Sequence, residues 1–178
     1  MEKQLIIRRI ASSITTLPNK KDWILLGILF FLFSAIVLPL GFISHFLTVE
    51  SVDFSAATIF RCFVVTLITP AILEELFYRV ILLPHNSEDI STKEKSILGS
   101  ISLIVYVLSH PLNGLTFYKI ALPTFTDPVF LFDTTLLGII CTIIYWRSGS
   151  LWSSVIIHWL VVGVWLMFLG GGTKLNLI

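Results

Sequence analysis

The chain has 178 residues, of which 56% are hydrophobic and only 13% are charged, and its mean hydropathy is +0.93. An average soluble domain is about 45–50% apolar and about 25% charged, so this composition excludes a disordered chain and argues against an ordinary soluble domain. The 12 basic and 11 acidic residues give a net charge of +1, which provides no bulk attraction to nucleic acid.

The first 22 residues form a polar, basic leader. Ile6, Ile10 and Ile14 recur at helical spacing beside Arg8 and Arg9. This pattern is typical of a basic amphipathic helix that lies on an anionic membrane surface. A merely solvated leader fits the same residues equally well, and both interpretations stay open here.

Five apolar segments that follow are long enough to cross a bilayer, which takes roughly 20 residues of helix. We expect them at residues 23–47, 57–83, 96–115, 129–146 and 151–169. The sequence therefore predicts an all-α protein, a polytopic bundle of about five transmembrane helices around a buried polar site. Pro70 predicts a kink in the second of these spans.

The distribution of charge between the spans predicts an orientation. Basic residues concentrate in the leader and, with Lys93 and Lys95, after the second span, whereas the loop after the first span carries Glu50 and Asp53. Since basic loops stay on the cytoplasmic side, we expect a cytoplasmic N-terminus. We place this multi-pass integral membrane protein in the plasma membrane.

Seven ionisable residues fall inside the predicted spans, where each costs about 2.5–3.5 kcal/mol or more. Such residues usually face the interior of a bundle and indicate a function, although simple pairing between helices is the alternative. The seven are Arg61, Glu74, Glu75, Arg79, His110, Asp133 and His158.

The spacing of two adjacent carboxylates distinguishes their roles. Glu75 and Arg79 are four residues apart on one helical face, which favours an ion pair, whereas Glu74 points about 100° away. The unpaired Glu74 carboxylate suits general acid–base work, and with His110 and His158 it predicts a layer for hydrolysis. Zinc binding is the other chemistry of such a set, although no His-Glu-x-x-His helix is present.

Three further polar or reactive residues in the spans have simpler interpretations. We expect Asp133 either to hydrogen-bond a histidine and orient it or to cap its own helix. Arg61 is expected to reach the membrane surface or to pair with a carboxylate such as Asp133. Cys141 is expected to act as a small buried hydrophobic residue.

The order of these residues along the chain resembles the CPBP family, which comprises the type II CAAX prenyl endopeptidases and bacteriocin-processing or self-immunity membrane proteins. The resemblance covers roughly residues 57–165. It rests on Glu74-Glu75-x-x-x-Arg79, Tyr106-x-x-x-His110, Asp133-x-x-x-x-Gly138 and Gly149-Ser150-Leu151-Trp152 leading into His158.

The resemblance implies an all-helical intramembrane endopeptidase. It implies that Glu74 acts with His110 to activate water and that His158 helps to bind the oxyanion. Glu75 and Arg79 would support the site. The family is mostly regarded as glutamic-type, so no cofactor is expected, with zinc as the alternative. The implied partners are the lipid bilayer and a peptide or protein substrate, prenylated and membrane-embedded substrates included, and no nucleic acid.

Two positions depart from the family pattern. Tyr106 stands where the second motif usually has Phe, and Val162 stands four residues after His158, where active members often carry Asn. Loss of one oxyanion donor costs about 10²–10³ in rate. Three functions therefore stay open: a glutamic-type endopeptidase, a zinc-dependent intramembrane protease that uses the same residues, and a catalytically weak or inactive membrane immunity or scaffold protein.

We accordingly divide the chain into four parts. The basic interfacial leader takes residues 1–22, and the first transmembrane helix with its loop takes residues 23–56. A CPBP-like intramembrane peptidase domain takes residues 57–170, and a short tail takes residues 171–178.

Overall fold

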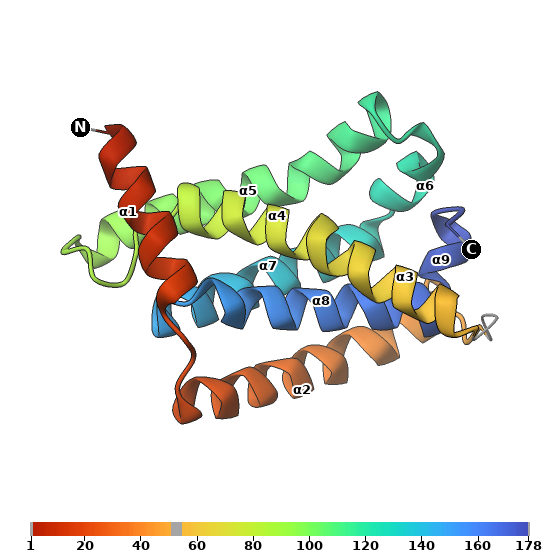
Figure 1. Ribbon diagram of the computed structural model, residues 1–178. Helices are drawn as coiled ribbons and strands as arrows, with labels where there is room; N and C mark the ends of the chain where they lie inside the picture. The colour runs from red at the N-terminus through yellow and green to blue at the C-terminus, as the bar shows by residue number, and fades with distance from the viewer. Residues whose placement is uncertain (1, 51–54, 178) are drawn as a thin grey trace.

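The computed structural model describes residues 2–50 and 55–177, and every regular element in these two ranges is helical (Figure 1). Asp53 of the expected acidic loop lies outside them. Five helices are long and apolar enough to cross a membrane, which confirms the all-α architecture and the number of spans. They are α2 (Lys20–Ile43), a composite second span (Ala56–Ile81), α5 (Thr92–Thr116), α7 (Pro128–Ser148) and α8 (Leu151–Phe168).

The second span is interrupted, as Pro70 predicts. It consists of α3 (Ala56–Thr66), a π-helical segment η1 (Leu67–Ile72), a short α4 (Leu73–Glu75) and a second π-helical segment η2 (Leu76–Ile81). Thr69 has non-helical backbone angles, φ −131° and ψ 110°, because a residue before proline is pushed out of the helical region. Irregular backbone is tolerated at membrane depth where it lines a cavity, and π-turns frequently occur at functional sites.

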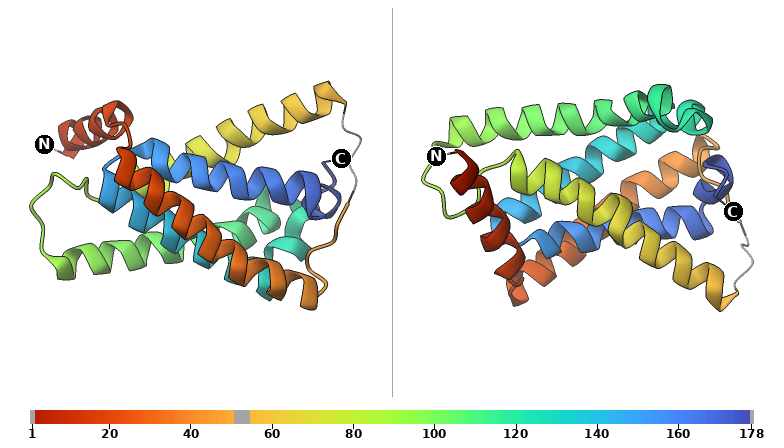
Figure 2. Two further views of the ribbon diagram at one scale, coloured as in Figure 1. Left: turned by 90° about the horizontal axis from the view of Figure 1, so that it is seen from below. Right: turned by 45° about the horizontal axis from the view of Figure 1, so that its top comes forward.

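The spans are joined so that the bundle has two distinct ends (Figures 1 and 2). The leader end carries helix α1 (Glu2–Thr15), the connection 82–91 and the turn between α7 and α8. The tail end carries the short elements η3 (Lys119–Ala121), α6 (Leu122–Phe125) and α9 (Gly171–Lys174). Consecutive spans therefore run in opposite directions between these two ends.

The turn between α7 and α8 at the leader end is tight. Gly149 ends α7 in the left-handed region with φ 68°, and the Ser150 side chain caps α8 by accepting a hydrogen bond from the Trp152 N–H. A β-carbon on Gly149 would lie 2.5 Å from the Asn86 side chain. Both the backbone conformation and the close approach therefore require glycine, and α7 and α8 pack as an antiparallel pair.

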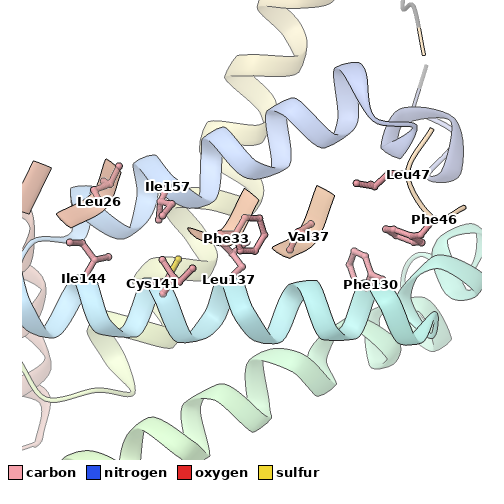
Figure 3. Packing of buried hydrophobic residues seen from close by; sticks show 11 residues of the cluster. Leu26, Phe33, Val37, Phe46, Leu47, Phe130, Leu137, Cys141, Ile144 and Ile157 are labelled. Atoms are coloured by element: carbon pink, nitrogen blue, oxygen red, sulfur yellow. The ribbon is translucent and has the colours of Figure 1, made fainter. Parts of the chain in front are cut away.

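Helix α2 completes the core by packing on α7 and α8 (Figure 3). The opposite faces of the spans expose large apolar side chains, such as Phe31 at 70% and Leu108 at 61%, which is expected for surfaces that contact lipid. The labelled residues of the core cluster are Leu26, Phe33, Val37, Phe46, Leu47, Phe130, Leu137, Cys141, Ile144 and Ile157.

Helix α1 is tied to the leader end of the bundle by Arg9. The Arg9 guanidinium donates to both carboxylate oxygens of Glu88, at 2.6 and 2.7 Å, and to the backbone oxygen of Ile81 at 3.3 Å. Ile81 is the last residue of η2. The leader is therefore attached directly to the end of the helix that carries the two adjacent glutamates.

Two further hydrogen bonds hold α1 against the other spans. The Ser13 and Tyr145 hydroxyls are 3.0 Å apart, both in buried surroundings, and the Trp152 indole N–H donates to the Ile14 backbone oxygen at 2.9 Å. Since Tyr145 lies on α7 and Trp152 on α8, α1 contacts three of the five spans.

The tail end is closed by side chains that bind the last described residues. The Tyr118 hydroxyl donates to the Leu175 backbone oxygen at 2.6 Å, and the Thr173 hydroxyl donates to a Glu50 carboxylate oxygen at 2.6 Å. The residues after α8 consequently pack back on the bundle, and Leu175 is buried.

Replacing Arg9 with Ala is expected to lower the thermal midpoint of the purified protein in detergent at neutral pH, by a small amount because the pair is partly exposed. The Arg9 hydrogen bonds hold the pKa of Glu88 below its ordinary value of 4.5. A lowered carboxyl pKa adds stability above the ordinary pKa, and that stability is lost as the pH falls through the folded-state pKa. The midpoints of the wild type and the variant should therefore converge in acid.

The matched control is Arg8→Ala, because Arg8 is exposed and the structure gives it no hydrogen bond to a described residue. A difference between wild type and Arg9→Ala that persists unchanged below the titration range of Glu88 would contradict this account.

Candidate active site

The predicted site residues lie on three different spans. Glu74 and Glu75 occupy α4, between the two π-helical segments, and Arg79 lies in η2. His110 lies on α5 and His158 on α8. The fold brings Glu75, Arg79 and His158 into direct contact, and it places Glu74, His110 and His158 on the wall of one cavity.

Glu75 is the centre of the direct contacts. One carboxylate oxygen, Oε2, lies 3.3 Å from Arg79 Nε, and both side chains are fully buried, so the predicted ion pair is confirmed. The other oxygen, Oε1, lies 2.8 Å from His158 Nδ1. A carboxylate can only accept, so His158 Nδ1 carries the proton of this bond and its Nε2 faces elsewhere.

Arg79 is held between this carboxylate and an aromatic ring. Its guanidinium carbon lies 4.9 Å from the centre of the Tyr106 ring, a cation–π distance. A β-carbon on Gly138 would come within 2.9 Å of the Tyr106 ring. The Asp133-x-x-x-x-Gly138 pattern therefore contributes the space that lets Tyr106 lie over Arg79.

Glu74 is the carboxylate without an arginine. Its Oε2 lies 4.0 Å from His158 Nε2 and has no hydrogen-bond partner among the described residues. The side chain is 26% exposed, toward the cavity that it lines. A separation of 4.0 Å is too long for a hydrogen bond, but one water molecule can bridge two polar atoms at this distance.

His110 faces the same cavity from α5. Its Nδ1 lies 3.0 Å from the backbone oxygen of Tyr106, so Nδ1 donates and the Nε2 of the neutral ring is an acceptor. The rings of Phe125 and Phe130 pack against it at 5.6 and 5.4 Å. Within the described residues no hydrogen bond or ion pair joins His110 to Glu74, and what the two share is the cavity.

The cavity has a volume of about 500 Å³ and extends from Glu74 toward the tail end. Helix α2 contributes to its wall although it precedes the motif residues. Apart from the acidic and histidine side chains the lining is mostly apolar. Its members include Phe33, Val37, Thr69, Pro70, Asp133, Leu137, Val162, Trp165, Leu169, Leu175 and Leu177.

Cys141 is fully buried in the hydrophobic core cluster, which confirms its interpretation as a small buried hydrophobic residue, and it also lies beside the site. Cys141, Glu75 and His158 each place a donor atom within 4.8 Å of the others, and all three are buried. Cys141 is three residues after Gly138 and therefore on the same helical face. This spacing could have indicated that Cys141 lies close to the site.

Glu75, Cys141 and His158 fit poorly as ligands of a zinc ion. The Arg79 guanidinium already contacts the Glu75 carboxylate and would repel a second cation there. The His158 Nδ1 proton lies between the other carboxylate oxygen and the ring, and a zinc ligand must be deprotonated.

Asp133 has none of its expected partners. Asp127 caps α7 by accepting from the N–H groups of Val129 and Phe130, so Asp133 does not cap the helix. No hydrogen bond or ion pair joins Asp133 to His110 or His158 among the described residues, and the Nδ1 atoms of both histidines bind other groups. Arg61 is exposed, and no ion pair joins it to Asp133 in the described part of the chain. These predictions for Asp133 are therefore wrong, and its Oδ1 is buried without a hydrogen-bond partner there.

Glu75→Gln is expected to destabilise the protein by about 3–5 kcal/mol, because it leaves the buried Arg79 without a counter-charge. Combining it with Arg79→Met removes the unpaired charge and should restore part of this loss. The measurement is the free energy of unfolding of both single variants and the double variant in detergent, analysed as a double-mutant cycle. A double variant as unstable as the sum of the two single changes would show that the pair is not coupled.

Comparison with known proteins identifies the family. No curated protein and no solved structure matched the chain. A family model described as type II CAAX prenyl endopeptidase Rce1-like matches residues 56–164, which include both glutamates, Arg79 and both site histidines but not α1 or α2. This match covers more than half of the chain and confirms the CPBP resemblance. The chain is thus a multi-pass membrane protein that belongs to the Rce1-like family of type II CAAX prenyl endopeptidases, a family of intramembrane proteases.

Proposed function

We propose that this protein is an intramembrane endopeptidase that hydrolyses a peptide bond with a water molecule activated by Glu74. The observation that carries the proposal is the Glu74 carboxylate, which has no arginine partner and lies 4.0 Å from His158 inside a largely apolar cavity. A carboxylate in such a place is a candidate general base. Membership of a protease family supports the same reaction class.

In the first step Glu74 takes a proton from water, whose oxygen attacks the carbonyl carbon of the scissile bond. His110 supports this step through Nε2, which its Nδ1 bond to the Tyr106 backbone leaves as an acceptor. The two groups reach the cavity from different helices, Glu74 from α4 and His110 from α5.

In the second step the charge on the carbonyl oxygen is stabilised and the bond breaks. His158 donates from Nε2 when it carries a second proton, and its bond to Glu75 holds the ring in position. The C–N bond then breaks as Glu74 passes its proton to the leaving nitrogen. The products are a carboxylate and an amine, so one water molecule is consumed.

Glu75 and Arg79 act as positioning residues in this scheme. Their buried ion pair fixes the carboxylate that binds His158, and the Tyr106 ring holds the guanidinium in turn. Neither residue needs to contact the substrate for this role.

The proposed substrate is a peptide or protein segment that enters the cavity from the membrane. An apolar lining of about 500 Å³ suits a prenylated or membrane-embedded segment, because burial of apolar groups drives such binding. The proposal includes a plasma-membrane location with a cytoplasmic leader end, which the basic residues of that end support.

Glu74→Gln is expected to abolish cleavage, because the amide cannot accept the proton of the attacking water. The measurement is hydrolysis of a panel of prenylated and unmodified peptides by purified protein in detergent micelles. His110→Ala and His158→Ala should each lower kcat by at least about 10². Retention of cleavage by Glu74→Gln would rule out the proposed mechanism.

Two controls separate this reaction from its alternatives. Asp89→Asn, an exposed change outside the site, should leave cleavage unchanged. If the purified protein contains stoichiometric zinc, and if a chelator removes activity that added zinc restores, the zinc-dependent protease would be favoured.

Val162→Asn is expected to raise kcat by about 10²-fold, because an amide would add a hydrogen-bond donor to the cavity one helical turn after His158. Val162→Leu, which changes the size without adding a donor, is the matched control and should not raise kcat. Equal rates for Val162→Asn and wild type would show that the missing donor does not limit catalysis.

An apolar Val162 on the cavity wall also favours a second candidate, a catalytically inactive immunity or scaffold protein. Normal cellular function of a Glu74→Ala, His110→Ala double variant would support this candidate over the endopeptidase.

A further inference from the structure

We propose that Asp133 forms a specificity subsite, in which its carboxylate binds a positively charged side chain of the substrate. This inference rests on the proposed endopeptidase function and names a feature of its substrate: an apolar segment with one lysine or arginine close to the scissile bond.

The first step is the position of Asp133 on the cavity wall. Asp133 lines the cavity from α7, together with Phe130 one turn before it and Leu137 one turn after it. The Phe130 ring packs on the His110 ring at 5.4 Å. A group bound by Asp133 would therefore lie within about one helical turn of the His110 side of the site.

The second step is the lack of an internal partner for Asp133. Its Oδ1 is buried and accepts no hydrogen bond from a described residue. Asp133 as a whole is partly exposed, but a carboxylate oxygen that leaves water without a compensating partner is unfavourable, and polar groups inside a membrane protein usually mark a functional site.

The third step is that no described base forms an ion pair with Asp133. Arg79 is paired with Glu75, and the Lys174 ammonium lies over the Phe46 ring at 5.0 Å. Arg61 points to the exposed surface of its helix. We therefore assign the cation that Asp133 would bind to a molecule in the cavity, and in the proposed function that molecule is the substrate.

The fourth step is that Asp133 is a charged residue among mostly apolar neighbours. The cavity near it is lined by aromatic and aliphatic side chains such as Phe130, Leu137 and Trp165. In such surroundings a charge-assisted hydrogen bond is strong, and a mismatched charge is rejected. One carboxylate is sufficient to select one basic residue in an otherwise apolar segment.

The test compares matched peptides. The probe is a short apolar peptide with a quenched fluorophore and a single lysine placed at successive positions, and the matched peptide has norleucine in place of lysine. Wild type should show kcat/KM about tenfold or more higher for lysine than for norleucine at one position. Asp133→Asn should lose this preference, which is measured as the ratio of kcat/KM between the lysine and norleucine peptides.

Two variants separate a role in specificity from a role in folding. Asp133→Glu keeps the charge and should retain the lysine preference, whereas Asp133→Lys should reverse it in favour of a glutamate peptide. Asp89→Asn, an exposed acid of the connection 82–91, should keep the wild-type preference. A lysine preference that survives in Asp133→Asn, or a wild type that cleaves the lysine and norleucine peptides equally well, would overturn the proposal.

Binding separates this inference from the proposed reaction. The same peptides are titrated against Glu74→Gln with and without Asp133→Asn, and fluorescence anisotropy is measured. Tighter binding of the lysine peptide that depends on Asp133, without cleavage by wild type, would uphold the subsite and reject the reaction. Cleavage that depends on Glu74 but is equally fast for the lysine and norleucine peptides would uphold the reaction and reject the subsite.

Discussion

The buried ion pair between Glu75 and Arg79 is the interaction on which the rest of the site depends. It lets a carboxylate and a guanidinium remain fully buried, and each partner then organises a further group. Glu75 binds His158, and Arg79 lies under the ring of Tyr106. Three spans are joined in this way around one pair of charges, and the neighbouring Glu74 is left to face the cavity.

Much of the fold follows from the sequence because lipid imposes simple rules. A helix must be long enough to cross the bilayer and must satisfy its own backbone, so run length and charge predicted five spans, all of which are present. The i,i+4 spacing of Glu75 and Arg79 likewise predicted their pairing, and Pro70 the interruption of the second span, because both depend on positions close together in the chain.

Features that depend on the packing of distant residues could not be predicted in this way. The bond between His158 and Glu75 joins residues 83 apart in sequence, and nothing in either local pattern selects Glu75 over Glu74. The proximity of Cys141 to Glu75 and His158 depends on how their helices pack, and the local sequence around Cys141 alone does not establish it. Asp133 had several reasonable roles in the sequence, but Asp127 caps α7 in its stead and the backbone oxygen of Tyr106 binds Nδ1 of His110.

The position of α2 has a consequence for how such a protein diversifies. The proposed catalytic residues lie within residues 56–164, the part matched by the family, whereas Phe33 and Val37 of the cavity wall belong to a helix that precedes it. The chemistry and the shape of the space around it are thus encoded in separate stretches of the chain. Mutations in α2 are free to remodel what the protein accommodates while every ionisable group of the site stays where it is.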